Sequence, residues 1–198
     1  MHMDSQLRWN NHVDQVSSKM SSNIFALRNL ANYVSSTVLR IAYFALCQSH
    51  MAYCITIWGH AASAKRVFGM QRKVIRVVAR LFYRTDCKSA FKRLRIMTFY
   101  SLYVYSCLCY AKANLHCFNT CKDVHSHSTR NSENLRTPFV RLATSQYGPN
   151  FWSVKFFNAL PTEIKNLPTH LFKKQVKETL LCNPLYCIED YFVVKFKC

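Results

Sequence analysis

Residues 65–84 read KRVFGMQRKVIRVVARLFYR, and the apolar and basic side chains separate when this segment is drawn as a helix. One half of the helix is apolar, the other half is basic, and no acidic residue interrupts the basic half. The pattern predicts a basic helix over residues 62–84 that packs on a core with one face and binds a polyanion with the other. A merely solvated charged face is the alternative. The predicted nucleic-acid contacts are Lys65, Arg66, Arg72, Lys73, Arg76, Arg80 and Arg84.

Glycine is scarce in the chain. The 198 residues contain only three glycines, and no Asn-Gly or Asp-Gly pair signals a tight hairpin. Apolar residues instead recur every three or four positions through long stretches, which is typical of helices. The sequence therefore predicts a mainly α fold, and the segment YCITIW at 53–58 is either a brief strand or the end of a helix. Helices are expected over residues 11–34, 36–50, 86–95, 99–118, 152–159 and 169–181.

The composition changes at residue 119. Residues 119–137 are polar and rich in Ser, Thr, Asn and His, which is typical of a linker or an exposed loop. This segment divides the chain into a helical bundle over residues 1–118 and a smaller, partly irregular helical C-terminal region over residues 138–198.

The charge of the chain is strongly unbalanced. Lys and Arg number 27 against 9 Asp and Glu, which gives a net charge of +18. Nucleic acid is the commonest partner of such a surface, and an anionic membrane is the next. No apolar stretch is long enough to span a bilayer, so a membrane partner is not expected. The N-terminus has no apolar signal region, so the ten cysteines are interpreted as reduced thiols of an intracellular, nuclear or cytoplasmic protein that is not secreted.

The sequence contains no convincing catalytic constellation. The nine acidic residues are scattered, and the only adjacent pair is Glu189 and Asp190 near the C-terminus. A two-metal site needs carboxylates that converge on both ions, and a phosphate-binding loop needs clustered glycines. No catalytic residue and no cofactor are therefore predicted.

One loop carries metal-ligand residue types. Two thiols and two imidazoles would suit tetrahedral zinc, but their spacing matches no common zinc module. A metal-free Cys- and His-rich loop is therefore the preferred interpretation. The zinc candidate consists of Cys117, Cys121, His125 and His127.

Three tyrosines at helical spacing, Tyr100, Tyr103 and Tyr105, lie close in sequence to Arg93 and Arg95. Such rings could stack on nucleic-acid bases. Aromatic residues at this spacing are more often part of a core, and that is the preferred interpretation. The basic helix is the better candidate for nucleic-acid binding, because its charges form one arc.

Several segments, taken in order, resemble the C-terminal part of non-LTR retrotransposon reverse transcriptases of the jockey-like insect type. YCITIWG at 53–59 resembles the family's Y-G-I-x-x-W-G segment, with Cys54 where glycine is usual. QRKVIR at 71–76 is similar to its Q-K-K-A-I-R helix, and FNALPTEI at 157–164 to its F-N-x-L-P-x-x-I pattern. Further similarities are DSQLRWNNH at 4–12, FALRNL at 25–30, FKRLRI at 91–96, TR at 129–130 and FKK at 172–174. The tail from residue 182 onward matches less clearly.

The resemblance implies a thumb-like helical bundle with the region that follows it. In this family the fingers and palm precede the thumb, and the palm holds Mg²⁺ through an F/Y-x-D-D motif. This chain contains no Asp-Asp pair. The resemblance thus implies a truncated RNA-directed DNA polymerase fragment without polymerase activity of its own, whose partners are an RNA/DNA duplex or primer-template and the missing palm and fingers. A non-enzymatic basic helical adaptor, or a decaying transposon product without function, are the alternatives.

Overall fold

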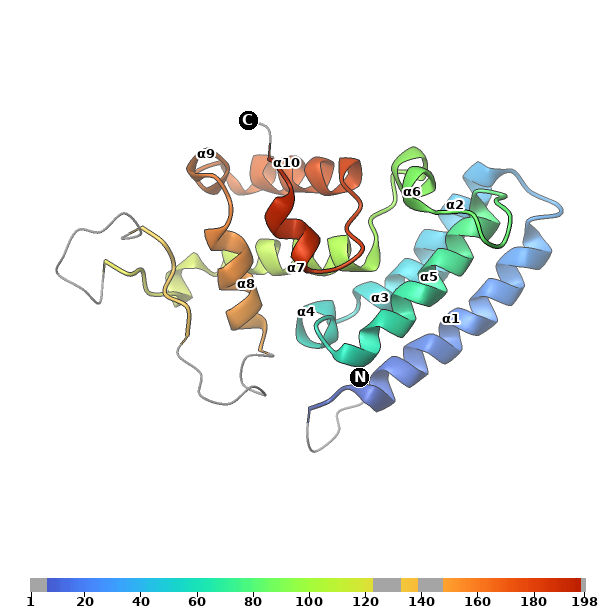
Figure 1. Cartoon of the computed structure of the whole chain (residues 1–198), viewed down its shortest axis with the longest axis horizontal. Helices are drawn as coiled ribbons and strands as arrows, with labels where there is room; N and C mark the ends of the chain where they lie inside the picture. The colour runs from blue at the N-terminus through green and yellow to red at the C-terminus, as the bar shows by residue number, and fades with distance from the viewer. Residues whose placement is uncertain (1–6, 123–132, 139–147, 197–198) are drawn as a thin grey trace.

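The computed structural model describes residues 7–122, 133–138 and 148–196 of the chain. Helix accounts for 68% of the structure and strand for 1%, and the described residues form no sheet (Figure 1). The predicted mainly α fold is therefore confirmed.

The first half of the chain is built on two long helices that lie side by side, α1 (Asn10–Leu30) and α5 (Lys65–Val78) (Figure 1). Between them the chain forms α2 (Ser36–Tyr43), a π-helical turn η1 (Phe44–Gln48) and α3 (Ser49–Ala52) in direct succession. Ser35 caps α2, because its side chain accepts a hydrogen bond from the Val38 N–H. Two short elements, α4 (Ile55–Trp58) and the 3₁₀ turn η2 (Ala62–Ala64), lead into α5.

Residues 55–58 of the YCITIW segment are helical, as α4. Tyr53 is extended, and Cys54 has a φ of 50°, in the left-handed region, so α3 ends there and α4 begins anew at Ile55. The Trp58 indole N–H donates to the Tyr53 carbonyl at 2.9 Å, which closes this turn. The β-branched residues of this segment suggested a strand, but no neighbouring strand is available among the described residues to pair with it.

The second half of the chain is arranged around α7 (Phe99–Ala113), which packs against α8, α10 and α4 (Figure 1). Thr98 caps α7, and the helix ends at Ala113, short of the expected end at 118. The other elements are α6 (Lys88–Leu94), η3 (Leu115–Cys117), α8 (Pro149–Asn158), α9 (Thr162–Lys165), α10 (Thr169–Cys182) and η5 (Glu189–Val193).

The buried side chain of Gln71 connects α2, α5 and the start of α7. The Gln71 amide nitrogen donates to the Tyr43 hydroxyl at 2.8 Å and to the Met97 carbonyl at 2.9 Å, and its amide oxygen accepts from the Phe99 N–H at 2.7 Å. Gln71 is fully buried, so each of these groups would lose a partner if the side chain were apolar. The bonds fix α5 against α2 and against the start of α7.

The tail beyond α10 is part of the core. The Thr98 hydroxyl donates to the Leu185 carbonyl at 2.7 Å, and the Tyr191 hydroxyl donates to the Phe156 carbonyl at 2.9 Å. Leu185 and Tyr191 are both buried. The tail therefore stabilises α7 and α8.

Parts of the segment predicted as a linker are ordered against α8. Thr120 and Leu135 form an isolated antiparallel bridge, and the Asn158 side chain bonds both the N–H and the carbonyl of Leu135, at 2.9 and 2.8 Å. The division of the chain into domains at residues 119–137 stays a prediction.

The basic helix is shorter than the sequence suggested. Its α-helical part runs from Lys65 to Val78 rather than over residues 62–84. Arg80 has a φ of 54°, and the N–H groups of Arg80 and Leu81 bond back to the carbonyls of Val77 and Arg76, which is the Schellman arrangement that ends helices. Helical periodicity continued past this point, but nothing in it marked Arg80 as a left-handed residue.

Two glycines give opposite predictions for substitution by alanine. A Cβ at Gly59 would lie 2.4 Å from Tyr103 Cδ2 and 2.7 Å from the Ile55 carbonyl oxygen, whereas a Cβ at Gly69 would meet nothing within 4 Å. We expect Gly59→Ala to lower the free energy of unfolding by about 1–3 kcal/mol through overpacking. We expect Gly69→Ala to raise it by up to about 1 kcal/mol, because alanine is the better helix former. Urea unfolding followed by circular dichroism measures both, and equal effects of the two variants would contradict this packing.

Cys54 gives a second prediction. A left-handed φ is unfavourable for any residue with a Cβ, so Cys54→Gly should raise the free energy of unfolding by roughly 0.5–1 kcal/mol. The matched control is Cys109→Gly within α7, which should lower it by about 1 kcal/mol, as glycine does in a helix interior. A loss of stability in Cys54→Gly, measured by the same urea titration, would mean that residue 54 is not left-handed.

Candidate nucleic-acid interface

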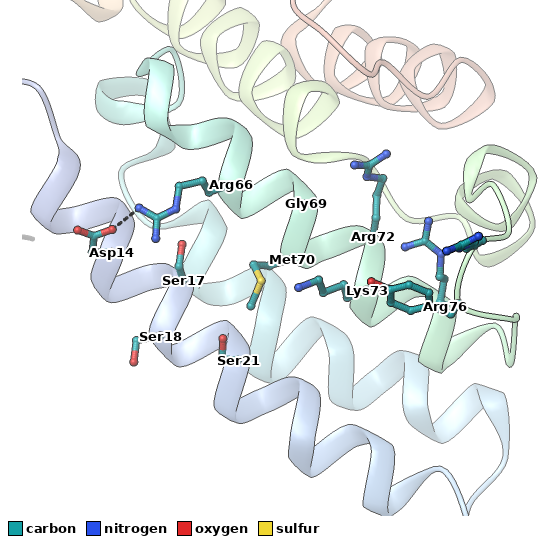
Figure 2. A pocket seen from close by; sticks show the side chains of 12 residues that line it. Asp14, Ser17, Ser18, Ser21, Arg66, Gly69, Met70, Arg72, Lys73 and Arg76 are labelled. Carbon is teal, nitrogen blue, oxygen red and sulfur yellow. Dashed lines mark hydrogen bonds and ion pairs between the residues drawn. The ribbon is translucent and has the colours of Figure 1, made fainter.

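A groove of about 1040 Å³ runs between α1 and α5, and Figure 2 shows the side chains that line it. The α5 wall is cationic, and the α1 wall carries hydroxyl groups. The lining residues are Asp14, Ser17, Ser18, Ser21, Arg66, Gly69, Met70, Arg72, Lys73, Arg76, Tyr83 and Arg84.

Five of the seven predicted contact residues line this groove: Arg66, Arg72, Lys73, Arg76 and Arg84. The other two do not. Lys65 is exposed outside it, and the Arg80 guanidinium donates to the carbonyls of Ala31 and Val34, each at 2.9 Å. Arg80 therefore satisfies carbonyl groups left open where α1 ends, so its role as a phosphate contact is not supported by its position.

The groove cations are held in different ways. Arg66 forms an ion pair with Asp14 at 2.5 Å, and both side chains are more than half exposed, so this pair contributes little to stability. The Arg72 guanidinium lies 5.2 Å from the centre of the Phe68 ring. Arg76 donates through Nε to the Thr85 carbonyl at 3.0 Å. Lys73 is exposed and has no hydrogen-bond or ion-pair partner within the described part of the chain.

The α1 wall was not found from the sequence. Ser17 is only 9% exposed, and its hydroxyl has no hydrogen-bond partner among the described residues. Ser17 is one of the residues that line the groove, although its hydroxyl oxygen is itself covered by neighbouring atoms. The run SSKMSS at residues 17–22 was the available signal, because serine is a poor choice for a helix interior.

Gly69 forms part of the groove surface. A glycine in a helix interior costs about 1 kcal/mol relative to alanine, and no neighbouring atom requires its small size here. Its absent side chain leaves the α5 backbone open to close approach by a ligand.

The groove has the chemistry of a polyanion site. It presents five guanidinium or ammonium groups against the single carboxylate of Asp14. Among the described residues no group of three or more His, Cys, Asp or Glu side chains could hold a metal ion. The described lining contains neither an activated nucleophile nor a paired acid and base. The cations of the groove suit contacts with phosphate groups.

The zinc candidate is only partly within the described structure. Cys117 is exposed and Cys121 is half-buried, while His125 and His127 lie outside the described residues. The nine described cysteines carry no disulfide. Burial raises the pKa of Cys47 and of Cys107 to about 12, so these two thiols stay protonated and are poor nucleophiles.

The tyrosines considered for base stacking are mainly structural. Tyr103 is fully buried and packs edge-on against Phe156, and Tyr100 and Tyr105 are half-buried against the core. The interpretation of these rings as core is therefore confirmed for Tyr103. Two other aromatic residues, Phe82 and Tyr83, are exposed beside the groove instead, at 90% and 74%. A helix over residues 62–84 would place Phe82 on its apolar face. This prediction is wrong, because α5 ends at Val78.

None of the helices in the described ranges is both long enough and apolar enough to cross a bilayer.

Comparisons with protein-family models, with curated protein sequences and with solved structures give no match to this chain. The groove is accordingly interpreted from its own residues.

Proposed function

We propose that the chain binds the sugar-phosphate backbone of nucleic acid in the groove between α1 and α5. We further propose that it is the thumb and downstream region of a non-LTR retrotransposon reverse transcriptase of the jockey-like type. The observation that carries the first proposal is the collection of five cations and a bare glycine backbone in one groove.

Phosphate is the ligand that these groups suit best. A guanidinium group presents a fork of N–H donors that matches two phosphate oxygens, and serine hydroxyls add neutral donors. Because the groove lies between two helices in direct contact, we expect it to take one sugar-phosphate strand at a time. A duplex would therefore bind through the backbone of one of its strands. Contacts of this kind position nucleic acid without reading its sequence.

The family proposal is supported by where its motif residues lie. Cys54 stands where the family has glycine, and its φ of 50° is in the region that favours glycine. Gln71, which opens the QRKVIR segment, is the buried amide that joins α2, α5 and α7. Asn158, in the FNALPTEI segment, holds Leu135. The segments that resemble the family thus contain positions where the fold requires a particular backbone conformation or hydrogen-bonding side chain.

The proposal also gives the chain its partners. These are an RNA/DNA duplex or primer-template and the palm and fingers of the parent polymerase. Mg²⁺ and nucleotide addition belong to that palm, and an intracellular, nuclear or cytoplasmic location follows from the same proposal.

Lys73 provides the cleanest electrostatic test. Binding through four or five phosphate contacts should weaken roughly 100-fold between about 50 and 200 mM salt, and each contact contributes about one unit to the slope of log affinity against log salt. We expect Lys73→Glu to weaken binding of a labelled RNA/DNA hybrid about tenfold at the lower salt and to reduce that slope by at least about one unit. Fluorescence anisotropy over a salt series measures both quantities.

The control is Lys174→Glu on α10, an exposed lysine outside the groove, which makes the same change in net charge. Equal loss of affinity in the two variants would mean that net charge, not the groove, determines binding. A flat salt dependence of the unaltered chain would favour an adaptor that binds a protein.

Gly69→Leu tests the groove without changing its charge. Leucine is a good helix former and meets no steric obstacle at Cβ, so the fold should retain its stability. Its side chain would occupy the surface along which the strand passes. We expect affinity for the same hybrid to fall severalfold, whereas Gly69→Ala should bind almost normally. Unchanged binding by Gly69→Leu would exclude Gly69 from the contact surface.

A further inference from the structure

The turn that follows α5 displays two neighbouring aromatic rings at one end of the basic groove. Phe82 is 90% exposed and Tyr83 is 74% exposed. Burying such rings would stabilise the fold, so their exposure leaves large apolar surfaces available to a ligand. Tyr83 itself lines the groove.

Hydrogen bonds join the turn at residues 80–85, which we call the aromatic turn, to α5 and to the chain just after α1. The Thr85 N–H donates to the Phe82 carbonyl at 3.1 Å, and the Thr85 carbonyl accepts from Arg76 of α5 at 3.0 Å. Arg80 bonds the two carbonyls just beyond the end of α1. The backbone that carries the rings is therefore fixed relative to both helices of the groove, and less conformational entropy is lost when a ligand stacks on them.

Tyr83 also lines a second, smaller recess of about 180 Å³ next to the groove. Val77 and Leu81 form its apolar wall. Its cationic rim consists of Arg28 together with Lys73 and Arg76, and these last two line the groove as well. An apolar and aromatic recess thus opens beside a row of phosphate-binding cations.

We propose that this recess takes an unpaired nucleobase, which stacks on Tyr83 while the phosphates on either side of it lie in the groove. The inference rests on the proposed nucleic-acid function and specifies its substrate class as nucleic acid with unpaired nucleotides, such as a single strand or an overhang. A base in an intact duplex is already stacked on its neighbours, whereas an unpaired base presents its face to an aromatic side chain. Stacking of this kind tolerates any base, in keeping with the sequence-independent contacts of the groove.

The test compares two strands of equal length and charge, using the full chain at low salt. One is a single-stranded DNA 12-mer, and the other is the same backbone with abasic sites throughout. We expect the strand with bases to bind about 5- to 150-fold more tightly, the range for stacking of one base. Tyr83→Ala should abolish this difference, because the strand with bases then loses its stacking partner, and Tyr83→Phe should preserve it. A 2-aminopurine in the strand should lose fluorescence on binding, except with Tyr83→Ala.

The control variant is Tyr53→Ala, which removes an exposed tyrosine that lines neither the groove nor the recess. Equal binding of both strands by the unaltered chain would overturn the stacking inference and leave the groove proposal standing. If neither strand binds, the groove proposal itself is overturned. Tighter binding to phosphatidylserine vesicles than to the strand with bases would reassign the two rings to a membrane surface.

Discussion

The packing of α1 against α5 is the interaction on which the rest of the structure depends. It buries part of the apolar face of α5, while Phe68 of the same helix packs against Phe91 and Tyr100. It also brings the hydroxyls of α1 opposite the cations of α5. Five fully or largely buried side chains, each contributing roughly 1.5–3 kcal/mol, give on the order of 10 kcal/mol of gross stabilisation. Repulsion between exposed cations is screened and costs under about 1 kcal/mol for each pair. Burial therefore dominates, and the fold tolerates a groove of one charge. The buried side chains of α5 in this sum are Val67, Phe68, Val74, Ile75 and Val78.

Arginine serves two purposes in this region. In the groove, Arg72 and Arg76 keep N–H groups available while part of each side chain is held by the fold. Arg80 instead bonds open carbonyls beyond the end of α1 and so joins the far ends of the two groove helices. The groove thus combines a rigid frame with unneutralised charge, which are the two properties a phosphate-binding surface needs.

A good part of this arrangement was predictable from the chain. The period of 3.6 residues identified the helices, and the separation of basic from apolar residues identified the face of α5 that carries the cations. The end of α5 was not predictable in this way, because a left-handed arginine at position 80 breaks the helix where glycine would be the usual signal. For the same reason Phe82 and Tyr83 are exposed rather than buried. The tyrosines of α7 have the opposite outcome, and Tyr103 is central to the core.

The sequence by itself determined the helical character of the chain and the cationic face of one helix, because both follow from the local order of polar and apolar residues. Only the tertiary structure decided that this face is one wall of a groove. Arg66 meets Asp14 across 52 residues of chain, and no local pattern encodes so distant a contact. Ser17, Gly69 and Tyr83 come to line one groove only when burial of apolar side chains brings α1, α5 and the turn after α5 together.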